Sequence, residues 1–301
     1  MCVFTLTSFL YSPNNVVEGV YIALGAQKAD REVLQVRRRD DQGGDEPSVH
    51  VSKSEFKSQF LIALRLSRVG RAPEVFVGTS GWMYGWNPDS LDWYVSNSGL
   101  NAVELNASFY RFPQRRQVES WARRGASLKW SVKIHRYITH VRRLKEEALD
   151  TLRRFLELFA PLDPQVDFYL AQLPPAFDKR REHVERLKRF AEASGLGRRL
   201  AVEFRHGSWF DGETVDLCRE LGITAVSVDE PDATWIVETN GVVYLRMHGR
   251  TAWYAHEYTA EELEETARRV LSLGPERIYV FFNNDHWMLE NARAMLRLLR
   301  T

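Results

Sequence analysis

Ionisable and polar residues occupy every second position in several short segments of this sequence. Glu104 and Asn106 alternate with apolar neighbours in one such segment, and the same spacing recurs around Lys133, Arg205 and Arg246. Successive side chains of a β-strand point to opposite faces, so each segment predicts a strand with one apolar and one polar face. An unpartnered polar group in an apolar environment costs roughly 2–7 kcal/mol. A polar face repeated over several strands therefore indicates a shared functional cavity.

Two glutamates are candidates for acid–base chemistry. Glu104 and Glu203 lie on different predicted strands. Paired carboxylates can act as acid and base, or as nucleophile and acid in glycoside hydrolysis. Each glutamate could equally be the ion-pair partner of a nearby lysine or arginine, which is the usual state of a buried carboxylate. Both interpretations stay open at the level of sequence.

Three cations share the polar faces of these strands. Lys133, Arg205 and Arg246 together would form a positive clamp, which favours an anionic ligand. Lys133 could also form a Schiff base if its neighbours lowered its pKa. We favour a salt-bridged lysine that contacts a substrate phosphate.

Four histidines fall at or just after predicted strand ends: His135, His140, His206 and His248. We predict that His206 or His248 donates a proton, since imidazole titrates near neutral pH. With the glutamates these rings could also form a metal site. A cluster that already holds a lysine and two arginines would repel a cation, and no His-x-His or HExxH spacing occurs. We therefore expect neither a metal nor a cofactor.

The remaining candidates are groups that would orient or stack on a ligand. The predicted first strand runs into residues 78–82 (GTSGW), where the Thr79 hydroxyl could donate to an anion, although an ordinary tight turn explains the segment equally well. Aromatic rings in the loops could stack on bases or sugars, or anchor the loops. The full set of predicted binding residues is Thr79, Trp82, Asn106, Tyr110, Lys133, Gln172, Arg205, Trp209, Arg246 and Asn283.

Strands and helices alternate regularly from residue 75 onward. The predicted strands are 75–78, 102–105, 129–134, 168–173, 200–204, 224–228, 242–247 and 277–282. The predicted helices are 89–98, 114–124, 145–159, 180–193, 212–221, 260–273 and 287–299. Between the sixth and seventh strands, residues 234–238 and the turn at 239–241 predict a hairpin. Eight strands with helical crossovers predict an α/β fold of the (β/α)8 TIM-barrel class. An open doubly wound sheet is the second choice, but it would need a glycine-rich phosphate loop that is not present.

Composition restricts the class of protein. The chain has 301 residues and a formal net charge of +1, so global attraction to nucleic acid or membrane is not supported and any anion site must be local. Its two cysteines, Cys2 and Cys218, cannot form a disulfide framework or a thiolate zinc cluster. No apolar run approaches the roughly 20 residues that span a bilayer. We expect a cytoplasmic protein with no membrane partner, and the sequence sets no oligomeric state.

The first 74 residues differ from the rest. Residues 37–47 (RRRDDQGGDEP) are charged and contain no apolar side chain, which is typical of a linker or of disorder. We predict two parts, an N-terminal extension over 1–74 and a barrel over 75–301. The extension is either a poorly ordered segment or upstream sequence included by an early start assignment.

Several of these segments together resemble the YecE-like family, also called domain of unknown function 72. They are 78–82, 103–110, 133–140, 172–175 (QLPP), 203–209, 246–249 (RMHG) and 282–284 (FNN), in order along residues 75–299. The resemblance implies a TIM barrel. It also implies that the matching positions are Glu104, Asn106, Tyr110, Lys133, Gln172, Glu203, Arg205, His206, Arg246, His248 and Asn283. The barrel is similar to that of the endonuclease IV group, which suggests a repair-related role by analogy only.

Our leading functional hypothesis is an enzyme, such as a hydrolase, that acts on an anionic phosphorylated ligand at the carboxyl-terminal mouth of the barrel. The ligand would be a nucleotide or nucleic acid, with Glu104, Glu203, His206 and His248 as catalytic groups. A metal-independent carbohydrate-active enzyme using the two glutamates is one alternative. A non-catalytic ligand-binding protein is the other.

Overall fold

The computed structural model describes residues 10–12, 15–17, 33–36, 49–52 and 72–300. The chain divides into two compact units, Met1–Ala72 and Pro73–Thr301. In the first unit, β1 (Leu10–Ser12) pairs antiparallel with β2 (Asn15–Val17), and β3 (Val33–Val36) pairs antiparallel with β4 (Val49–Ser52). Most of the predicted extension over 1–74, including the charged stretch at 37–47, lies outside the described residues.

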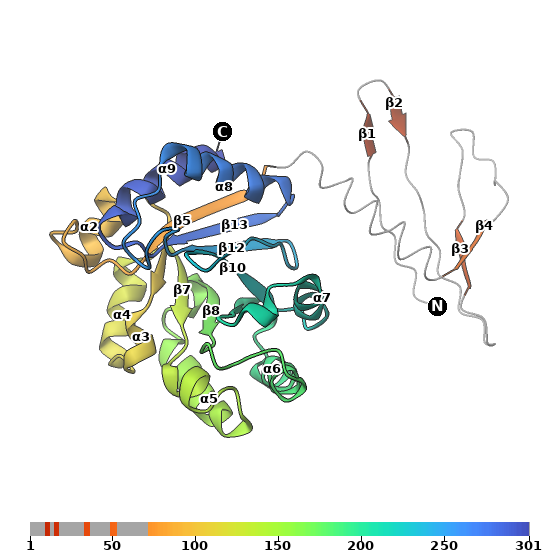
Figure 1. Cartoon of the computed structure of the whole chain (residues 1–301), viewed down its shortest axis with the longest axis horizontal. Coiled ribbons are helices and arrows are strands. Elements are labelled where there is room, and N and C mark those ends of the chain that lie inside the picture. Colours follow the sequence, from red (N-terminus) through yellow and green to blue (C-terminus); the bar gives the residue numbers. More distant parts are fainter. Residues whose placement is uncertain (1–9, 13–14, 18–32, 37–48, 53–71, 301) are drawn as a thin grey trace. The chain divides into compact units, whose positions relative to one another are not determined.

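The second unit contains a closed barrel of eight parallel strands (Figure 1). In chain order they are β5 (Glu74–Ser80), β6 (Ala102–Leu105), β7 (Lys129–Lys133), β8 (Val166–Gln172), β9 (Leu200–Glu203), β10 (Thr224–Glu230), β12 (Val242–Met247) and β13 (Arg277–Phe282). Each strand pairs with its neighbours along the chain, and β13 closes the barrel by pairing with β5. The predicted (β/α)8 class is confirmed.

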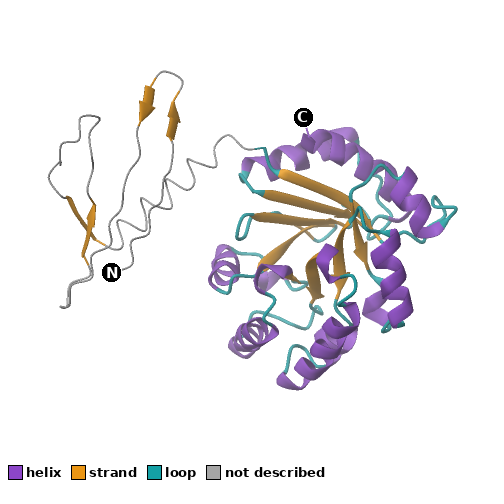
Figure 2. Ribbon diagram, turned by 180° about the vertical axis from the view of Figure 1, so that it is seen from behind, coloured by secondary structure: helices purple, strands orange, loops and turns teal. Residues whose placement is uncertain are grey.

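Helices surround the strands on the outside (Figure 2). The long ones are α2 (Ser90–Asn97), α4 (Arg115–Arg124), α5 (Leu149–Phe159), α6 (Arg181–Ser194), α7 (Gly212–Glu220), α8 (Ala260–Ser272) and α9 (Met288–Arg300). All seven predicted helices are present, with ends displaced by a few residues. Several short elements were not predicted, among them α3 (Ala107–Tyr110), directly after β6, and the π-helical turn η1 (Tyr137–Val141), which follows β7.

The connection between β10 and β12 is a hairpin, as predicted. The short strand β11 (Ala233–Trp235) pairs antiparallel with β10. A second tight turn then leads into β12, where Thr239 and Val242 exchange backbone hydrogen bonds. Asn240 and Gly241 both have positive φ, at 53° and 85°. This is the conformation that an Asn-Gly pair favours in a two-residue turn.

The alternation of the barrel strands separates an outer core from the barrel interior. Outward residues such as Val103 and Val202 pack in the large hydrophobic cluster beneath the helices. Inward residues form a second cluster, which contains Phe168, Tyr244 and Tyr279. This apolar layer supports the polar side chains that follow at the carboxyl-terminal ends of the strands. Among the described residues, no helix is long and apolar enough to cross a bilayer.

Candidate functional site

The strands of the barrel place a group of polar side chains at its carboxyl-terminal mouth. These side chains lie at or just beyond the strand ends and point towards the barrel axis. They are Ser80, Glu104, Lys133, Gln172, Glu203, Arg205, Glu230, Arg246, His248 and Asn283. This is the end of a TIM barrel at which ligands bind.

Glu104 is fully buried and accepts four hydrogen bonds. Arg246 donates to both of its oxygens, from Nη2 to Oε1 over 2.7 Å and from Nε to Oε2 over 3.0 Å. Ser80 Oγ adds a bond of 2.8 Å and the Tyr244 hydroxyl one of 2.7 Å. A carboxylate has about four acceptor positions, so this one is saturated.

Glu203 is the second buried carboxylate of the site. Arg246 Nη1 donates to its Oε2. Arg205 Nε lies against its Oε1 as an ion pair without hydrogen-bond geometry. Arg205 Nη1 also donates to Glu230 over 2.8 Å. Three carboxylates and two guanidinium groups thus form one continuous network across the barrel.

This network makes both predicted bases weak. Burial raises the pKa of Glu104, but the charge and hydrogen bonds of Arg246 outweigh it and lower that pKa below its usual value. Burial also acts against ionisation of Glu203, yet Arg205 and Arg246 hold its pKa well below the usual range. A carboxylate in this state has little tendency to accept a proton. The geometry favours structural positioning for both glutamates.

His248 is fully buried beside the two arginines. Its Nε2 lies 3.1 Å from Arg205 Nη2 and 3.4 Å from Arg246 Nη1. Guanidinium groups only donate, so Nε2 is placed to accept from Arg205, and the amide nitrogen Nδ2 of Asn283 lies 3.2 Å from Nδ1. Burial and the charge of Arg246 lower the pKa of His248 to about 3. This neutral acceptor suits a positioning role better than the predicted role of proton donor.

Lys133 differs from the other cations because it is buried without a carboxylate partner. Its side chain is 9% exposed, and Nζ lies 4.5 Å from the centre of the Phe109 ring. Among the described residues, no carboxylate oxygen lies within the 4.0 Å limit for an ion pair with Nζ. Burial and the charge of Arg246 lower the pKa of Lys133 to about 7, although Glu203 and Glu104 act in the opposite direction.

A positive field surrounds the region next to Lys133. The ring of His140, in η1, packs edge-on against Phe109 with 4.9 Å between centroids. Burial, followed by the charges of Lys133, Arg136 and Arg205, lowers the pKa of His140 to about 4. His140 therefore stays neutral at pH 7, and the positive charges near it come from Lys133 on β7 and from Arg205, just beyond β9.

Aromatic rings form part of the rim. Trp253, in the loop between β12 and α8, is 36% exposed and stacks over the Arg205 guanidinium at 4.9 Å. Tyr254 is 45% exposed and packs against Trp253 and His248. Both rings combine a fixed position with an accessible face.

Three predicted binding residues lie away from this network. Thr79 points outward and its Oγ1 donates to the carbonyl of Gly81 over 2.6 Å. Trp82 is buried between Trp121 and Trp130. Trp209 is fully buried, stacked on Phe204, and donates to the carbonyl of Phe177 over 2.7 Å. These side chains anchor the structure outside the barrel and are not accessible to a ligand at the mouth.

Four other predicted residues lie at the strand ends without joining the network. His206 is exposed and forms a local contact of 2.8 Å with Ser208. Tyr110 is 68% exposed on α3. Gln172 is half-buried and pairs in register with Glu203, while Asn106 has a buried Oδ1 without a partner among the described residues.

The prediction missed Ser80, Tyr244 and Glu230. Tyr244 shares a strand face with Arg246 and His248, so the alternation itself could have found it. Ser80 and Glu230 occupy inward positions of β5 and β10, where no residue of the inward face had been chosen. Ser80, and not the predicted Thr79, points into the site, because Phe76, Gly78 and Ser80 share the inward face of β5. The Ser80 hydroxyl donates a hydrogen bond to Glu104.

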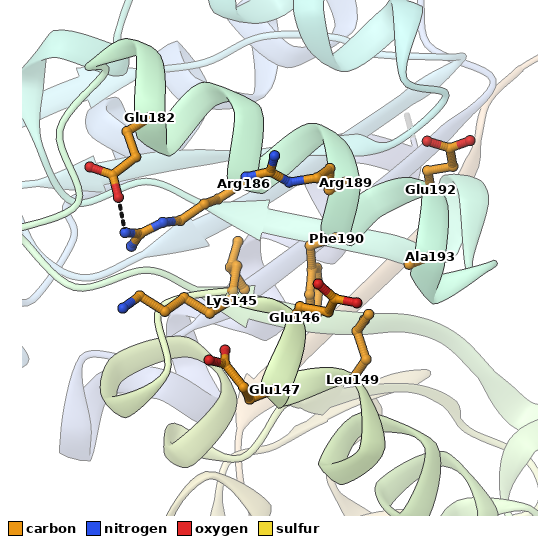
Figure 3. Close-up of a pocket in the computed structure, with 11 residues that line it drawn as sticks. Lys145, Glu146, Glu147, Leu149, Glu182, Arg186, Arg189, Phe190, Glu192 and Ala193 are labelled. Carbon is orange, nitrogen blue, oxygen red and sulfur yellow. Dashed lines mark hydrogen bonds and ion pairs between the residues drawn. The ribbon is translucent and has the colours of Figure 1, made fainter.

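A further cavity of the barrel unit lies away from the carboxyl-terminal mouth. A cavity of about 830 Å³ separates the start of α5 from α6, with Lys145, Glu147, Arg186 and Phe190 on its walls (Figure 3). It contains none of the predicted site residues. No three His, Cys, Asp or Glu side chains in the described part of the chain are arranged to hold a metal ion.

Comparisons with known proteins agree with the fold. The family model described as "Protein of unknown function DUF72" matches residues 76–301. The UPF0759 protein YunF of Bacillus subtilis is 26% identical over 270 residues, which cover 75% of this chain and 94% of YunF. A DUF72 family protein of Thermotoga maritima has a similar solved structure, with a TM-score of 0.62 and 30% identity, covering 75% of this chain and 98% of that one. A second, from Enterococcus faecalis, has a TM-score of 0.65 at 22% identity and covers 76% of this chain and 98% of its own.

Proposed function

Because the chain belongs to the DUF72 family, which is described as being of unknown function, we propose a function from the geometry of the site. The protein is an enzyme that binds a small phosphate-bearing anion at the carboxyl-terminal mouth of the barrel. Lys133 is the main contact of that anion.

The state of Lys133 is the observation that carries this proposal. A buried ammonium group without a counterion is costly, and an anionic ligand would supply the missing partner. Arg205 and Arg246 are already neutralised by Glu104 and Glu203. They form the floor of the site and fix its shape, so Lys133 is the one cation of the predicted clamp without an ion-pair partner among the described residues.

The surroundings of Lys133 support the same ligand class. Arg136 and Arg143, on either side of η1, add positive charge next to His140. A local field of one sign attracts an anion even in a chain with almost no net charge.

Aromatic residues on the rim favour a nucleotide, or the end of a nucleic acid, among phosphate-bearing ligands. Trp253 and Tyr254 offer exposed faces, and stacking of a base on an aromatic ring contributes about 1–3 kcal/mol. A group with a pKa near neutrality is suited to proton transfer, which favours an enzyme over a binding protein.

Hydrolysis of carbohydrates is less well supported. Both glutamates are bound to Arg246, and neither is poised as a protonated acid or as a free nucleophile. Burial raises the pKa of Glu230 to about 7, but Arg205 pairs with this carboxyl group, and a glycosidase also needs a second carboxylate that is free to act as nucleophile or base.

Binding of a nucleoside monophosphate and of the corresponding nucleoside, measured by calorimetry at pH 6.5, tests the proposal. We expect the phosphate to improve affinity about 10- to 100-fold, the value of a charge-assisted hydrogen bond. Lys133→Met should abolish that gain. Lys129→Met is the matched control, because Lys129 lies at the opposite end of β7 and pairs with Asp167. Equal binding of the two ligands, or an equal loss in both variants, would contradict the proposal.

A further inference from the structure

We propose that Lys133 is a reactive amine that forms an imine with an aldehyde or ketone group of the bound anion. This inference rests on the proposed anion-binding function and narrows it to ligands that carry both a carbonyl group and a negative charge. Lys133 then acts in two steps: as the ammonium it attracts the negative group, and after losing its proton it attacks the carbonyl carbon, while the positive field of Arg136 and Arg143 keeps the negative group in place.

The choice of residue at position 133 is the first argument. Eight of the 41 lysine and arginine residues of the chain are lysines. Lys133 is the only buried one within residues 72–300, the range in which burial is described. A permanent cation for holding phosphate is better made from arginine, which stays protonated and binds bidentately. A lysine at this position has the property that arginine lacks, the ability to lose its proton.

The second argument is the position of the amine. Ser108 Oγ donates to the Lys133 carbonyl over 2.7 Å and to that of Leu105 over 3.1 Å, which ties the end of β7 to the end of β6. The side chain then extends along the inner face of the barrel, with Phe109 as an apolar wall. A nucleophile held on a strand in this way approaches a ligand from a fixed direction.

Burial, followed by the charge of Arg246, keeps much of the Lys133 amine neutral at pH 7. Arg246 and Arg205 disfavour the ammonium form, Glu203 and Glu104 favour it, and burial tips the balance against it, with a pKa of about 7. Both glutamates direct their oxygens at arginines, so neither holds the amine in an ion pair. A desolvated lysine near other cations is the usual form of an amine nucleophile.

The chemistry balances without an added oxidant or reductant. The lone pair of Nζ forms a bond to the carbonyl carbon, and the carbonyl oxygen takes a proton released by the nitrogen. Loss of that hydroxyl group with a second proton, as water, leaves a protonated C=N bond. Solvent supplies and accepts these protons, and His140, a neutral imidazole on the same Phe109 ring, adds no further positive charge there.

Reductive trapping with pyridoxal 5′-phosphate tests the inference, because this probe carries an aldehyde and a phosphate. The full-length protein is incubated with the probe, reduced with borohydride and mapped by peptide mass spectrometry. We expect an adduct at Lys133 at probe concentrations at least about tenfold below those that label the exposed Lys145. The adduct should persist in Lys129→Met. Equal labelling of Lys133 and Lys145, or none at Lys133, would overturn the inference.

Two related probes separate this inference from the proposed function. Pyridoxine 5′-phosphate has the phosphate but no aldehyde, and pyridoxal has the aldehyde but no phosphate. Binding of the first without trapping of pyridoxal 5′-phosphate at Lys133 would leave the anion site standing and reject the imine. Equal trapping of pyridoxal and its phosphate at Lys133 would support the amine and reject the anion site.

Discussion

Arg246 and Glu104 form a bidentate ion pair inside the barrel, with donor–acceptor distances of 2.7 and 3.0 Å. Their side chains are 1% and 0% exposed, so water screens neither charge. The pair joins the second strand of the barrel to the seventh, which is far from it in sequence. It therefore fixes the floor of the site from opposite sides.

Replacing Arg246 with methionine should strongly destabilise the protein. Glu104 and Glu203 would both lose their buried cationic partner, and the loss of one member of a buried pair costs about 3–5 kcal/mol. Chemical denaturation with urea measures this change. Arg277→Met, which removes the largely exposed pair with Glu74, should cost less than about 1 kcal/mol. Similar losses in the two variants would show that the buried network is not essential.

Replacing Lys133 with methionine should stabilise the protein, most of all at low pH. The pKa of Lys133 is about 7 in the folded protein, whereas the ordinary value for a lysine is 10.5. The penalty for burying its charge is thus fully present below pH 7 and decreases as the pH rises from 7 towards 10.5. The increase in melting temperature should be larger at pH 6 than at pH 9. A gain that does not change with pH would place the lysine in water, with its ordinary pKa.

Glu230 should oppose anion binding only above neutral pH. Burial raises its pKa to about 7, against the attraction of Arg205, and Glu203 adds repulsion. The carboxyl group becomes charged as the pH rises through 7. Glu230→Gln should therefore match the wild type in its affinity for inorganic phosphate at pH 5.5 and exceed it at pH 8.5. A constant ratio over this range would assign Glu230 its ordinary pKa.

Trp209 should contribute to stability and Trp253 to ligand binding, although both follow the end of a barrel strand. Trp209→Ala should destabilise the fold by about 3–5 kcal/mol, because a fully buried indole is removed. Trp253→Ala should leave stability within about 0.5 kcal/mol and weaken nucleotide binding, since its ring is partly exposed. Urea denaturation and calorimetry separate the two effects. Loss of stability in Trp253→Ala would make that ring a loop anchor.

The fold and much of the network could be predicted from sequence because both depend on local alternation. Glu104, Lys133, Glu203 and Arg246 occupy inward positions for the same reason that their neighbours occupy the outer core. The eight strands and their crossovers then fix which ends converge.

Pairing within the site could not be predicted in this way. Which carboxylate takes which arginine depends on distances across the barrel, and Arg246 satisfies both glutamates while Lys133 has neither. The sequence also could not predict which aromatic side chains of the loops are buried and which are exposed. Trp209 and Trp253 both follow strand ends, but tertiary packing buries one and exposes the other.

Titration of Lys133 by NMR tests the central claim most directly. The chain has eight lysines, so ¹³Cε-labelled lysine gives few signals, and Lys133→Met identifies the one of interest. We predict a midpoint of about 7 for Lys133 and a shift to higher pH when inorganic phosphate is added. A midpoint near 10.5 that phosphate leaves unchanged would contradict the account.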